Sequence, residues 1–190
     1  MKDVVVIGGP NGAGKSTAAN RIFPKSLGLR HFLNADEIAR GLSPYDPNSA
    51  AIAAGRVLIE TIDTLVHSSQ SFAFETTCAG RGHLQRLRLC RSAGYRITLI
   101  FLWLPSAEMA LARVAHRVAH GGHGIPDDVV LRRYAAGLRN MRHHFLPLAD
   151  VAVIYDNSER GRVLVAEKHP DSALIVYDTA RWQIIEDATH

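Results

Sequence analysis

A complete phosphate-binding motif follows an apolar run near the start of the chain. Val4–Ile7 leads into the pattern G-x-x-x-x-G-K-S, and helix-forming residues come next. The glycines let successive backbone N–H groups wrap around a polyphosphate, and the N-terminus of the following helix adds its positive dipole end. The pattern therefore predicts a P-loop whose nucleotide contacts come from Gly9, Pro10, Asn11, Gly12, Ala13, Gly14, Lys15, Ser16 and Thr17.

Two side chains of this motif have predicted chemical roles. Lys15 is spaced to reach the β- and γ-phosphates of the nucleotide, where we expect it to act in catalysis. The Ser16 hydroxyl is placed to bind Mg²⁺. The Asn-Lys-x-Asp run of GTP-specific proteins does not occur in the sequence. We therefore expect ATP and Mg²⁺ as the cofactors.

The length and the charge of the chain limit the classes of protein to which it can belong. Its 190 residues suit one α/β domain, which we place at residues 1–190. Lys and Arg number 22 against 18 Asp and Glu, and the arginines gather between Arg81 and Arg142. A nucleic-acid surface would need a basic block or a basic stripe with aromatic residues. The distribution instead favours a phosphate-rich small ligand.

The cysteines and the apolar segments indicate a protein of the reducing cytoplasm. Cys78 and Cys90 form no CxxC pair, so we expect neither a disulfide framework nor a zinc site. The N-terminal residues lack the layout of a signal peptide, and the longest apolar stretch, Ile97–Leu104, is too short to span a bilayer. We therefore predict a cytoplasmic protein with no membrane partner.

Strand and helix patterns alternate along most of the chain. Such alternation predicts a mostly parallel sheet flanked by helices, the architecture of P-loop kinases. Near the C-terminus, Arg162–Glu167 and Ala173–Tyr177 flank a turn and predict an antiparallel hairpin. The other strand signals are Val4–Ile7, Arg30–Leu33, Ser71–Phe74, Tyr95–Leu104 and Val151–Tyr155. The helix signals are Asn48–His67, Leu84–Ala93 before Gly94, a helix capped by Ser106, and a helix that starts at Pro126.

Polar residues follow the second and third strand signals. Ligands of such sheets bind at the carboxyl ends of the strands. Asp36 could position an acceptor hydroxyl and take its proton, and Glu75, Thr76 and Thr77 could bind the acceptor. The alternative for Asp36 is an N-cap of a helix over Glu37–Gly41. The alternative for Glu75 is a strand-end carboxylate satisfied by solvent.

The expected metal site departs from the usual pattern in one respect. The strand Ile97–Leu104 ends in Pro105-Ser106, without the aspartate that usually supplies a second acidic metal anchor. Metal binding would then depend on Ser16, on water, and on Glu75 or Asp36.

An arginine-rich segment resembles a lid. Arg113 and Arg117 are four apart on one helix face, Gly121-Gly122 forms a joint, and Arg132 and Arg133 return on the next helix. Guanidinium groups that close over the phosphates would stabilise the charge that develops during phosphoryl transfer. The alternative for each arginine is an ordinary solvated position. A lid or surface role also fits His116, His120 and His123 better than a zinc site does.

Together, these motifs resemble the zeta-toxin family of P-loop kinases in its short form. The resemblance covers nearly the whole chain and rests on Gly9–Thr17, Asn34–Ala39, Ala54–Arg56, Phe74–Thr77, Gly121–Pro126, Arg132–Tyr134 and Tyr155–Ser158. It implies ATP-dependent phosphorylation of a sugar hydroxyl on UDP-N-acetylglucosamine or a related UDP-sugar. It also implies a separately encoded antitoxin as a possible protein partner.

The resemblance assigns roles to individual residues. Lys15 would hold the transferred phosphate and Asp36 would be the base. Glu75 and Thr77 would contact the acceptor, and the acceptor side would also include Arg56, Thr76 and His123. Arg117, with Arg113, Arg132 or Arg133, would clamp ATP. The alternative for Arg56 is a surface position on an amphipathic helix.

Two other functions use the same motifs. One is a kinase of another acceptor, such as an antibiotic, a nucleoside or a free sugar, for which the P-loop, Asp36 and the lid would serve unchanged. The other is a non-catalytic regulator in which ATP controls the docking of a protein partner. Lys15 and Asp36 argue against the regulator, because a protein that only binds nucleotide has no use for a base on the acceptor side.

Overall fold

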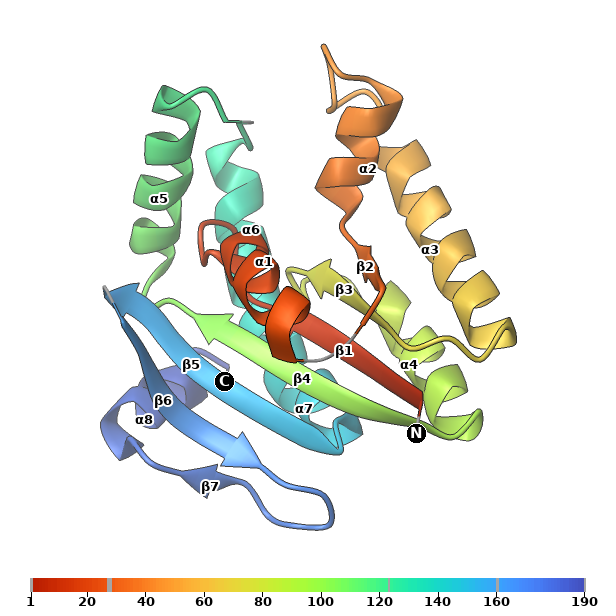
Figure 1. The fold of residues 1–190 in the computed structure, drawn as a ribbon. Helices are drawn as coiled ribbons and strands as arrows, with labels where there is room; N and C mark the ends of the chain where they lie inside the picture. Colours follow the sequence, from red (N-terminus) through yellow and green to blue (C-terminus); the bar gives the residue numbers. More distant parts are fainter. Residues whose placement is uncertain (1, 27–28, 123, 160, 190) are drawn as a thin grey trace.

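A seven-stranded mixed sheet forms the centre of the molecule (Figure 1). The computed structural model describes residues 2–26, 29–122, 124–159 and 161–189, with residues 21–26 described by their backbone alone. The strand order is β2-β3-β1-β4-β5-β6-β7, and the first five of these strands run parallel. The strands are β1 (Lys2–Gly8), β2 (His31–Leu33), β3 (Phe72–Thr76), β4 (Tyr95–Trp103), β5 (Val151–Glu159), β6 (Gly161–Lys168) and β7 (Ile175–Val176).

Helices connect the parallel strands, as the alternating pattern predicts, and the expected fold class is confirmed. The antiparallel pairing of β6 with β7 likewise confirms the predicted hairpin. The helices are α1 (Lys15–Ser26), α2 (Ala35–Leu42), α3 (Ala51–His67), α4 (Gly82–Ser92), α5 (Ala107–Ala119), α6 (Asp127–Asn140), the π-helix η1 (Met141–Phe145), α7 (Leu146–Leu148) and α8 (Thr179–Asp187).

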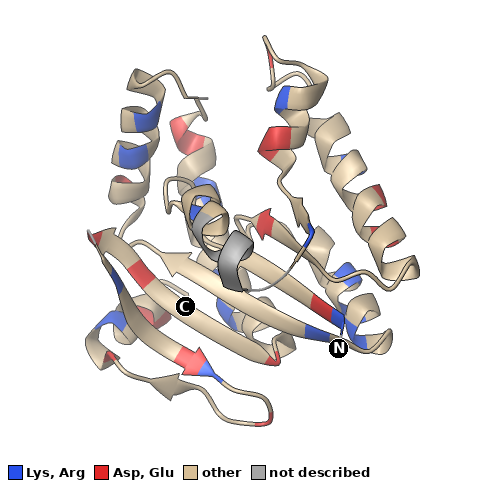
Figure 2. Cartoon of the chain, viewed as in Figure 1, with Lys and Arg blue, Asp and Glu red and all other residues tan. Residues whose placement is uncertain are grey.

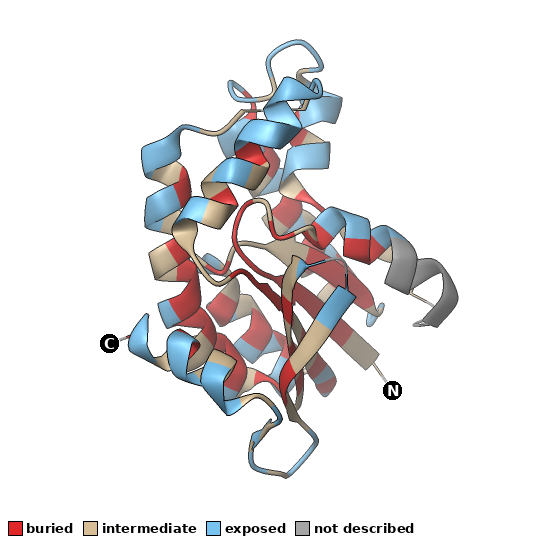
Figure 3. Cartoon of the chain, turned by 90° about the vertical axis from the view of Figure 1, so that its left-hand side faces the viewer, coloured by how far each residue is buried: buried red, intermediate tan, exposed pale blue. Residues whose placement is uncertain are grey.

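Side chains of the central strand β1 belong to two hydrophobic cores, because they alternate between the faces of the sheet. Val4 and Val6 belong to the larger core, whereas Val5 and Ile7 pack with Ala19 of α1 on the opposite face. Helix α1 covers that second face in front of the sheet, and α7 lies behind the sheet (Figure 1). Buried residues concentrate in the sheet and on the inner sides of the helices (Figure 3).

Helix boundaries follow the predicted caps. The Ser106 side chain accepts a hydrogen bond of 3.2 Å from the Met109 backbone N–H at the start of α5. Pro126 precedes α6, whose first turn holds Asp127 and Asp128 at the positive end of the helix dipole. Gly94 has a φ of +78° after α4. Of these caps, Ser106 fixes where the loop at the carboxyl end of β4 ends.

Candidate active site

The loop between β1 and α1 contains glycines at positions where a side chain would be strained. Gly9 has a φ of +145°, and a Cβ there would lie 2.3 Å from the Leu102 carbonyl oxygen. A Cβ on Gly12, whose φ is +77°, would meet the Cβ of Arg113 at 2.9 Å. The loop is therefore pressed against β4 on one side and against α5 on the other.

Lys15 is buried at the N-terminus of α1. Only 6% of its side chain is exposed, and its Nζ donates a hydrogen bond of 2.9 Å to the Pro10 carbonyl oxygen. Burial lowers the pKa of Lys15, and the negative charges of Glu75 and Asp36 oppose that shift. The ammonium group is thus held inside the loop and away from bulk water, where a bound phosphate would interact with it strongly.

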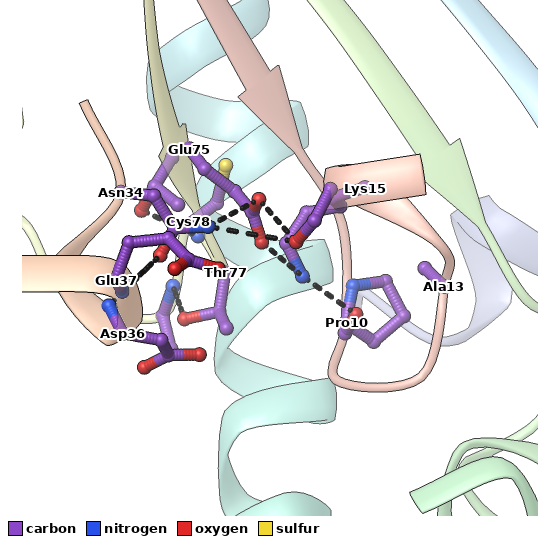
Figure 4. Close-up of polar contacts among 12 residues, drawn as sticks. Pro10, Ala13, Lys15, Asn34, Asp36, Glu37, Glu75, Thr77 and Cys78 are labelled. Carbon is purple, nitrogen blue, oxygen red and sulfur yellow. Dashed lines mark hydrogen bonds and ion pairs between the residues drawn. The ribbon is translucent and has the colours of Figure 1, made fainter. Parts of the chain in front are cut away.

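Glu75 lies at the centre of a polar network in front of the loop (Figure 4). Its Oε2 accepts hydrogen bonds of 2.8 Å from the Ser16 hydroxyl and 2.9 Å from Asn34 Nδ2, and its Oε1 lies 3.7 Å from Lys15 Nζ. The Glu75 side chain is only 11% exposed. The alternative of a strand-end carboxylate satisfied by solvent is therefore wrong.

Asn34, and not Asp36, caps helix α2. The Asn34 side chain accepts hydrogen bonds from the backbone N–H groups of Asp36 at 2.8 Å and Glu37 at 3.3 Å. The capping alternative for Asp36 is therefore wrong, because Asp36 already lies in the first turn. Its exposed carboxylate makes no hydrogen bond or ion pair within the described part of the chain. Asp36 is thus left facing a cavity.

That cavity, with a volume of about 570 Å³, joins the P-loop to the ends of β2 and β3 and is here called the acceptor cavity. Its size suits a small-molecule ligand. Of the residues predicted from the sequence, Asn11, Lys15, Asp36, Glu75, Thr76, Thr77, Arg132 and Arg133 line it. The structure therefore places most of the predicted acceptor residues around the same cavity as the predicted catalytic lysine.

The two threonines after β3 have hydroxyl groups suited to donation. Thr76 Oγ1 accepts a hydrogen bond of 3.0 Å from the Cys78 backbone N–H, and Thr77 Oγ1 accepts one of 3.4 Å from the Ala79 N–H. Because each oxygen already accepts from the backbone, each hydroxyl proton can be donated to a ligand in the acceptor cavity.

The lid arginines occupy different positions along α5. Basic residues lie on successive turns of this helix (Figure 2). Arg113 contacts the P-loop at Gly12 and donates a hydrogen bond of 2.6 Å to the Ser158 carbonyl oxygen. Arg117 is exposed near the C-terminal end of the helix. Neither residue lines the acceptor cavity.

The expected joint at Gly121-Gly122 is a helix cap. Gly121 has a φ of +81°, its N–H donates to the Val118 carbonyl oxygen at 3.0 Å, and the Gly122 N–H donates to the Arg117 carbonyl oxygen at 2.9 Å. This pair of bonds is a Schellman motif. The glycines therefore give α5 a defined end, from which the chain turns back towards α6.

Other predicted residues lie outside the acceptor cavity. Arg56 is exposed on α3 and is not among the lining residues. His116 and His120 stack on each other with ring centroids 4.2 Å apart, and His123 lies outside the described residues. Within the described residues, no group of three or more His, Cys, Asp or Glu side chains could hold a metal ion.

Sequence reasoning missed a hydrogen bond that holds the P-loop from the end of β5. We call this contact the brace. Asn157 Nδ2 donates a hydrogen bond of 2.7 Å to the Ala13 carbonyl oxygen, across 144 positions of sequence. The neighbouring Asp156 is only 2% exposed and forms an ion pair of 2.7 Å with Arg181 of α8. The end of β5 is thus fixed by the C-terminal helix and in turn holds the P-loop.

Sequence reasoning also missed His83, which lines the acceptor cavity. Burial, with a contribution from Arg86, lowers the pKa of His83 to about 4. Its ring packs against Phe74, with the ring centroids 4.9 Å apart. The cavity therefore presents a neutral imidazole at pH 7, a property that no local sequence signal could reveal.

None of the described helices is both long and apolar enough to cross a membrane.

Comparison with solved structures identifies the fold. A structure of the PezAT chromosomal toxin–antitoxin system of Streptococcus pneumoniae is similar with a TM-score of 0.64, at 14% identity over 99% of this chain and 86% of that chain. The AvrRxo1-ORF1:-ORF2 complex with ATP gives a TM-score of 0.74 at 16% identity, over 100% of this chain and 64% of that chain. A putative kinase from Chloroflexus aurantiacus gives 0.55 at 21% identity, over 70% of this chain and 75% of that chain.

Sequence comparison identifies the family. A protein of Haemophilus influenzae with no described function is 33% identical over 126 residues, which cover 66% of this chain and 88% of that protein. The family model described as an AAA domain matches residues 4–144. These residues contain the P-loop and all the residues that line the acceptor cavity. The chain therefore belongs to the AAA domain family of nucleotide-binding proteins and has the fold of P-loop kinases.

Proposed function

We propose that the protein is an ATP-dependent kinase that transfers the γ-phosphate to a hydroxyl group of a small molecule, UDP-N-acetylglucosamine or a related UDP-sugar. One observation carries the proposal: Lys15 of the P-loop and Asp36 line the same cavity. A protein that only binds nucleotide gains nothing from a carboxylate in that position. A kinase uses such a carboxylate to orient the acceptor hydroxyl and to take its proton.

On the nucleotide side, the phosphates bind along the P-loop. Lys15 Nζ exchanges its contact with the Pro10 carbonyl oxygen for the β- and γ-phosphates. A separate cavity of about 660 Å³ is lined by Gly14, Thr17 and Asn157, among others, and we assign the base and ribose of ATP to it. Arg113 and Arg117 approach the phosphates from α5, and Arg132 and Arg133 approach them from α6.

The oxygen atoms near Lys15 fit a magnesium ion. The Ser16 hydroxyl and the Glu75 carboxylate lie 2.8 Å apart, and both are hard oxygen ligands of the kind that Mg²⁺ prefers. These two residues would hold the ion together with water and phosphate oxygens. When bound, Mg²⁺ would neutralise charge on the transferring phosphoryl group.

On the acceptor side, this chain supplies a base and several donors. The Asp36 carboxylate accepts the proton of the acceptor hydroxyl as that oxygen attacks the γ-phosphate. The Thr76 and Thr77 hydroxyls donate hydrogen bonds that orient the acceptor. Arg56, which is exposed on α3 and does not line the cavity, stays a predicted acceptor contact. His123 stays one too and lies outside the described residues. This arrangement would serve other hydroxyl acceptors equally well, and the UDP-sugar rests on the family resemblance.

A separately encoded antitoxin is the protein partner that this function suggests. The PezAT structure is described as that of a toxin–antitoxin system, and the AvrRxo1-ORF1:-ORF2 structure is a complex of two proteins. A partner that covers the P-loop or the acceptor cavity of this chain would block ATP-dependent transfer.

The test is a transfer assay with Mg·ATP and a panel of UDP-sugars, free sugars, nucleosides and antibiotics, with products identified by mass spectrometry. We expect a phosphorylated UDP-sugar. Asp36→Asn should lower the transfer rate at least about 100-fold, because a positioned acid–base group contributes on that order.

Glu37→Gln is the matched control. Glu37 is the adjacent carboxylate on α2, does not line the acceptor cavity, and forms an ion pair of 2.7 Å with Arg40. This variant should transfer phosphate at the wild-type rate. Retention of more than about a tenth of the rate by Asp36→Asn would refute the base assignment. ATP binding without a product from any acceptor would refute the kinase.

A further inference from the structure

One buried side chain, Asn34, contacts both halves of the proposed active site. Asn34 lies between β2 and α2 and is 6% exposed. Its Oδ1 accepts hydrogen bonds from the backbone N–H groups of Asp36 and Glu37, and its Nδ2 donates one of 2.9 Å to Glu75 Oε2. The amide therefore joins the helix that carries the proposed base to a proposed ligand of Mg²⁺.

On the nucleotide side, Asn34 belongs to a group of polar side chains in front of the P-loop (Figure 4). Glu75 Oε2 also accepts a hydrogen bond of 2.8 Å from the Ser16 hydroxyl, and Asn34 Nδ2 lies 3.5 Å from that hydroxyl oxygen. Glu75 Oε1 lies 3.7 Å from Lys15 Nζ. A metal ion bound by Ser16 and Glu75 would therefore act on atoms that also contact the Asn34 amide.

On the acceptor side, Asn34 supports the first turn of α2. The first N–H groups of a helix have no partner within the helix, and the Asn34 oxygen satisfies two of them. Few side chains of this helix are buried: of its eight residues, all of which the structure describes, only Ala39 is. The cap is thus a main support of the turn that holds Asp36.

The amide of Asn34 is needed for the two contacts together. Asp is an equally favoured N-cap, but it has no donor and would place a second carboxylate beside Glu75. Ser also caps helices, but its side chain ends one atom before the position of the amide nitrogen. A serine at this position should therefore keep the cap of α2 and lose the contact with Glu75.

We propose that Asn34 is a positioning residue that couples the binding of Mg·ATP to the order of the first turn of α2, and thereby to the placement of Asp36. This inference rests on the proposed kinase function and adds a link between its two substrates. With the nucleotide and its metal ion bound, the Glu75 carboxylate would be fixed, and the Asn34 amide that donates to it would be fixed as well. The first turn of α2 then loses freedom before an acceptor enters, so that less ordering is left for the acceptor.

Hydrogen exchange at the Asp36 and Glu37 amides measures this coupling without an acceptor, because both N–H groups bond to Asn34 Oδ1. The probe is saturating Mg·AMP-PNP, an ATP analogue that resists transfer. It should slow exchange at these amides at least about fivefold in the wild type, which is the lower end of usual couplings between two sites. In Asn34→Ser, the probe should leave the exchange rates unchanged, while calorimetry should show that it still binds.

A residue that only stabilised α2 would behave differently, because its replacement would change exchange equally with and without the probe. Ser106→Asn is the matched control. It makes the reverse exchange at the cap of α5, and Ser106 does not line the acceptor cavity. This variant should keep the full effect of Mg·AMP-PNP on α2. If Asn34→Ser does not fold, Asn34→Thr offers a cap of the same reach, and the backbone φ of −134° suits a β-branched residue.

The transfer assay separates this inference from the kinase itself. Asn34→Ser should lower the transfer rate at least about fivefold at saturating substrates, because Asp36 is then placed independently of the nucleotide. Equal protection of α2 by Mg·AMP-PNP in the wild type and in Asn34→Ser would overturn the proposal, as would no protection in the wild type. Either result, beside transfer that Asp36→Asn abolishes, would refute this inference alone. Nucleotide-dependent protection without a product from any acceptor would refute the kinase and support the coupling.

Discussion

The nucleotide side and the acceptor side of the site are built in opposite ways. Around the P-loop, Ala13, Lys15 and Asn11 are 0%, 6% and 7% exposed, and the glycines leave no room for a side chain. Across the cavity, Asp36 and Arg132 are exposed. On the proposed function, the rigid loop would fix the phosphates in the geometry needed for transfer. The open wall would let the acceptor enter and leave.

Lys15→Ala should have the largest effect on the nucleotide side of the site, here called the closed side because its residues are buried. We expect transfer to fall about 100- to 1,000-fold, because a preorganised cation at the site of developing charge is lost. The variant should fold normally, since burial already disfavours the ammonium group. The measurement is the single-turnover transfer rate together with a thermal unfolding curve. Lys2→Ala, at the opposite end of β1, is the control, and transfer by Lys15→Ala at the control rate would contradict the role of Lys15.

Gly9→Ala tests how tightly the closed side is packed. The new Cβ would lie 2.3 Å from the Leu102 carbonyl oxygen at a backbone φ of +145°. We expect a loss of about 3 kcal/mol in the free energy of unfolding, since strained backbone and displaced neighbours both contribute. Urea denaturation measures it. An unfolding free energy equal to that of the wild type would mean that the loop can move away from β4.

His83 lines the acceptor cavity, and its burial there can be tested by the pH dependence of the free energy of unfolding. Its pKa is lowered to about 4, mainly by burial, so protonation favours the unfolded chain, in which the pKa is near 6.5. The stabilising contribution is complete above pH 6.5 and is lost as the pH falls towards 4. We expect a loss of about 2 kcal/mol or less at pH 5.

His83→Gln should remove that component of the pH dependence. The measurement is urea denaturation of both proteins at pH 7 and at pH 5. If the variant loses as much stability between these pH values as the wild type does, another group is responsible.

Gly55→Ala is the smallest expected effect and has the opposite sign to Gly9→Ala. Gly55 lies inside α3, and a Cβ there meets nothing within 4 Å. We expect the unfolding free energy to rise by about 0.5 to 1 kcal/mol, because alanine costs less entropy in a helix than glycine does. A destabilised Gly55→Ala would mean that this part of α3 has less free space than the structure shows around Gly55.

Local patterns predicted the fold and the centre of the site. The P-loop is encoded by consecutive residues, and the polar residues after β2 and β3 come together because parallel strands end at one edge of the sheet. The alternative that Asp36 caps α2 is wrong, because Asn34 precedes a first turn that contains two acids. Asn is also a favoured N-cap, so the sequence does contain the signal for the correct cap. The assignment of residues 1–190 to one domain stays a prediction.

Long-range contacts could not be predicted from the sequence. Asn157 and Ala13 are 144 positions apart, and Asn140 and Cys78 are 62 apart, so no local pattern links either pair. The pKa of His83 likewise depends on burial that only the packed structure defines. The joint expected at Gly121-Gly122 is a helix cap, because glycine pairs serve both purposes and only the backbone hydrogen bonds distinguish them.

The contact of Asn157 with the P-loop has a consequence for how members of this family are compared. The family model ends at residue 144, and the brace that reaches Ala13 comes from β5, beyond that boundary. Two relatives could therefore share every residue of the P-loop motif and still differ in the contacts that hold the P-loop from β5. A protein shortened to residues 4–144 would keep the P-loop sequence but lose the hydrogen bond from Asn157 to Ala13. The segment after residue 144 therefore contributes a contact that helps to hold the P-loop in place.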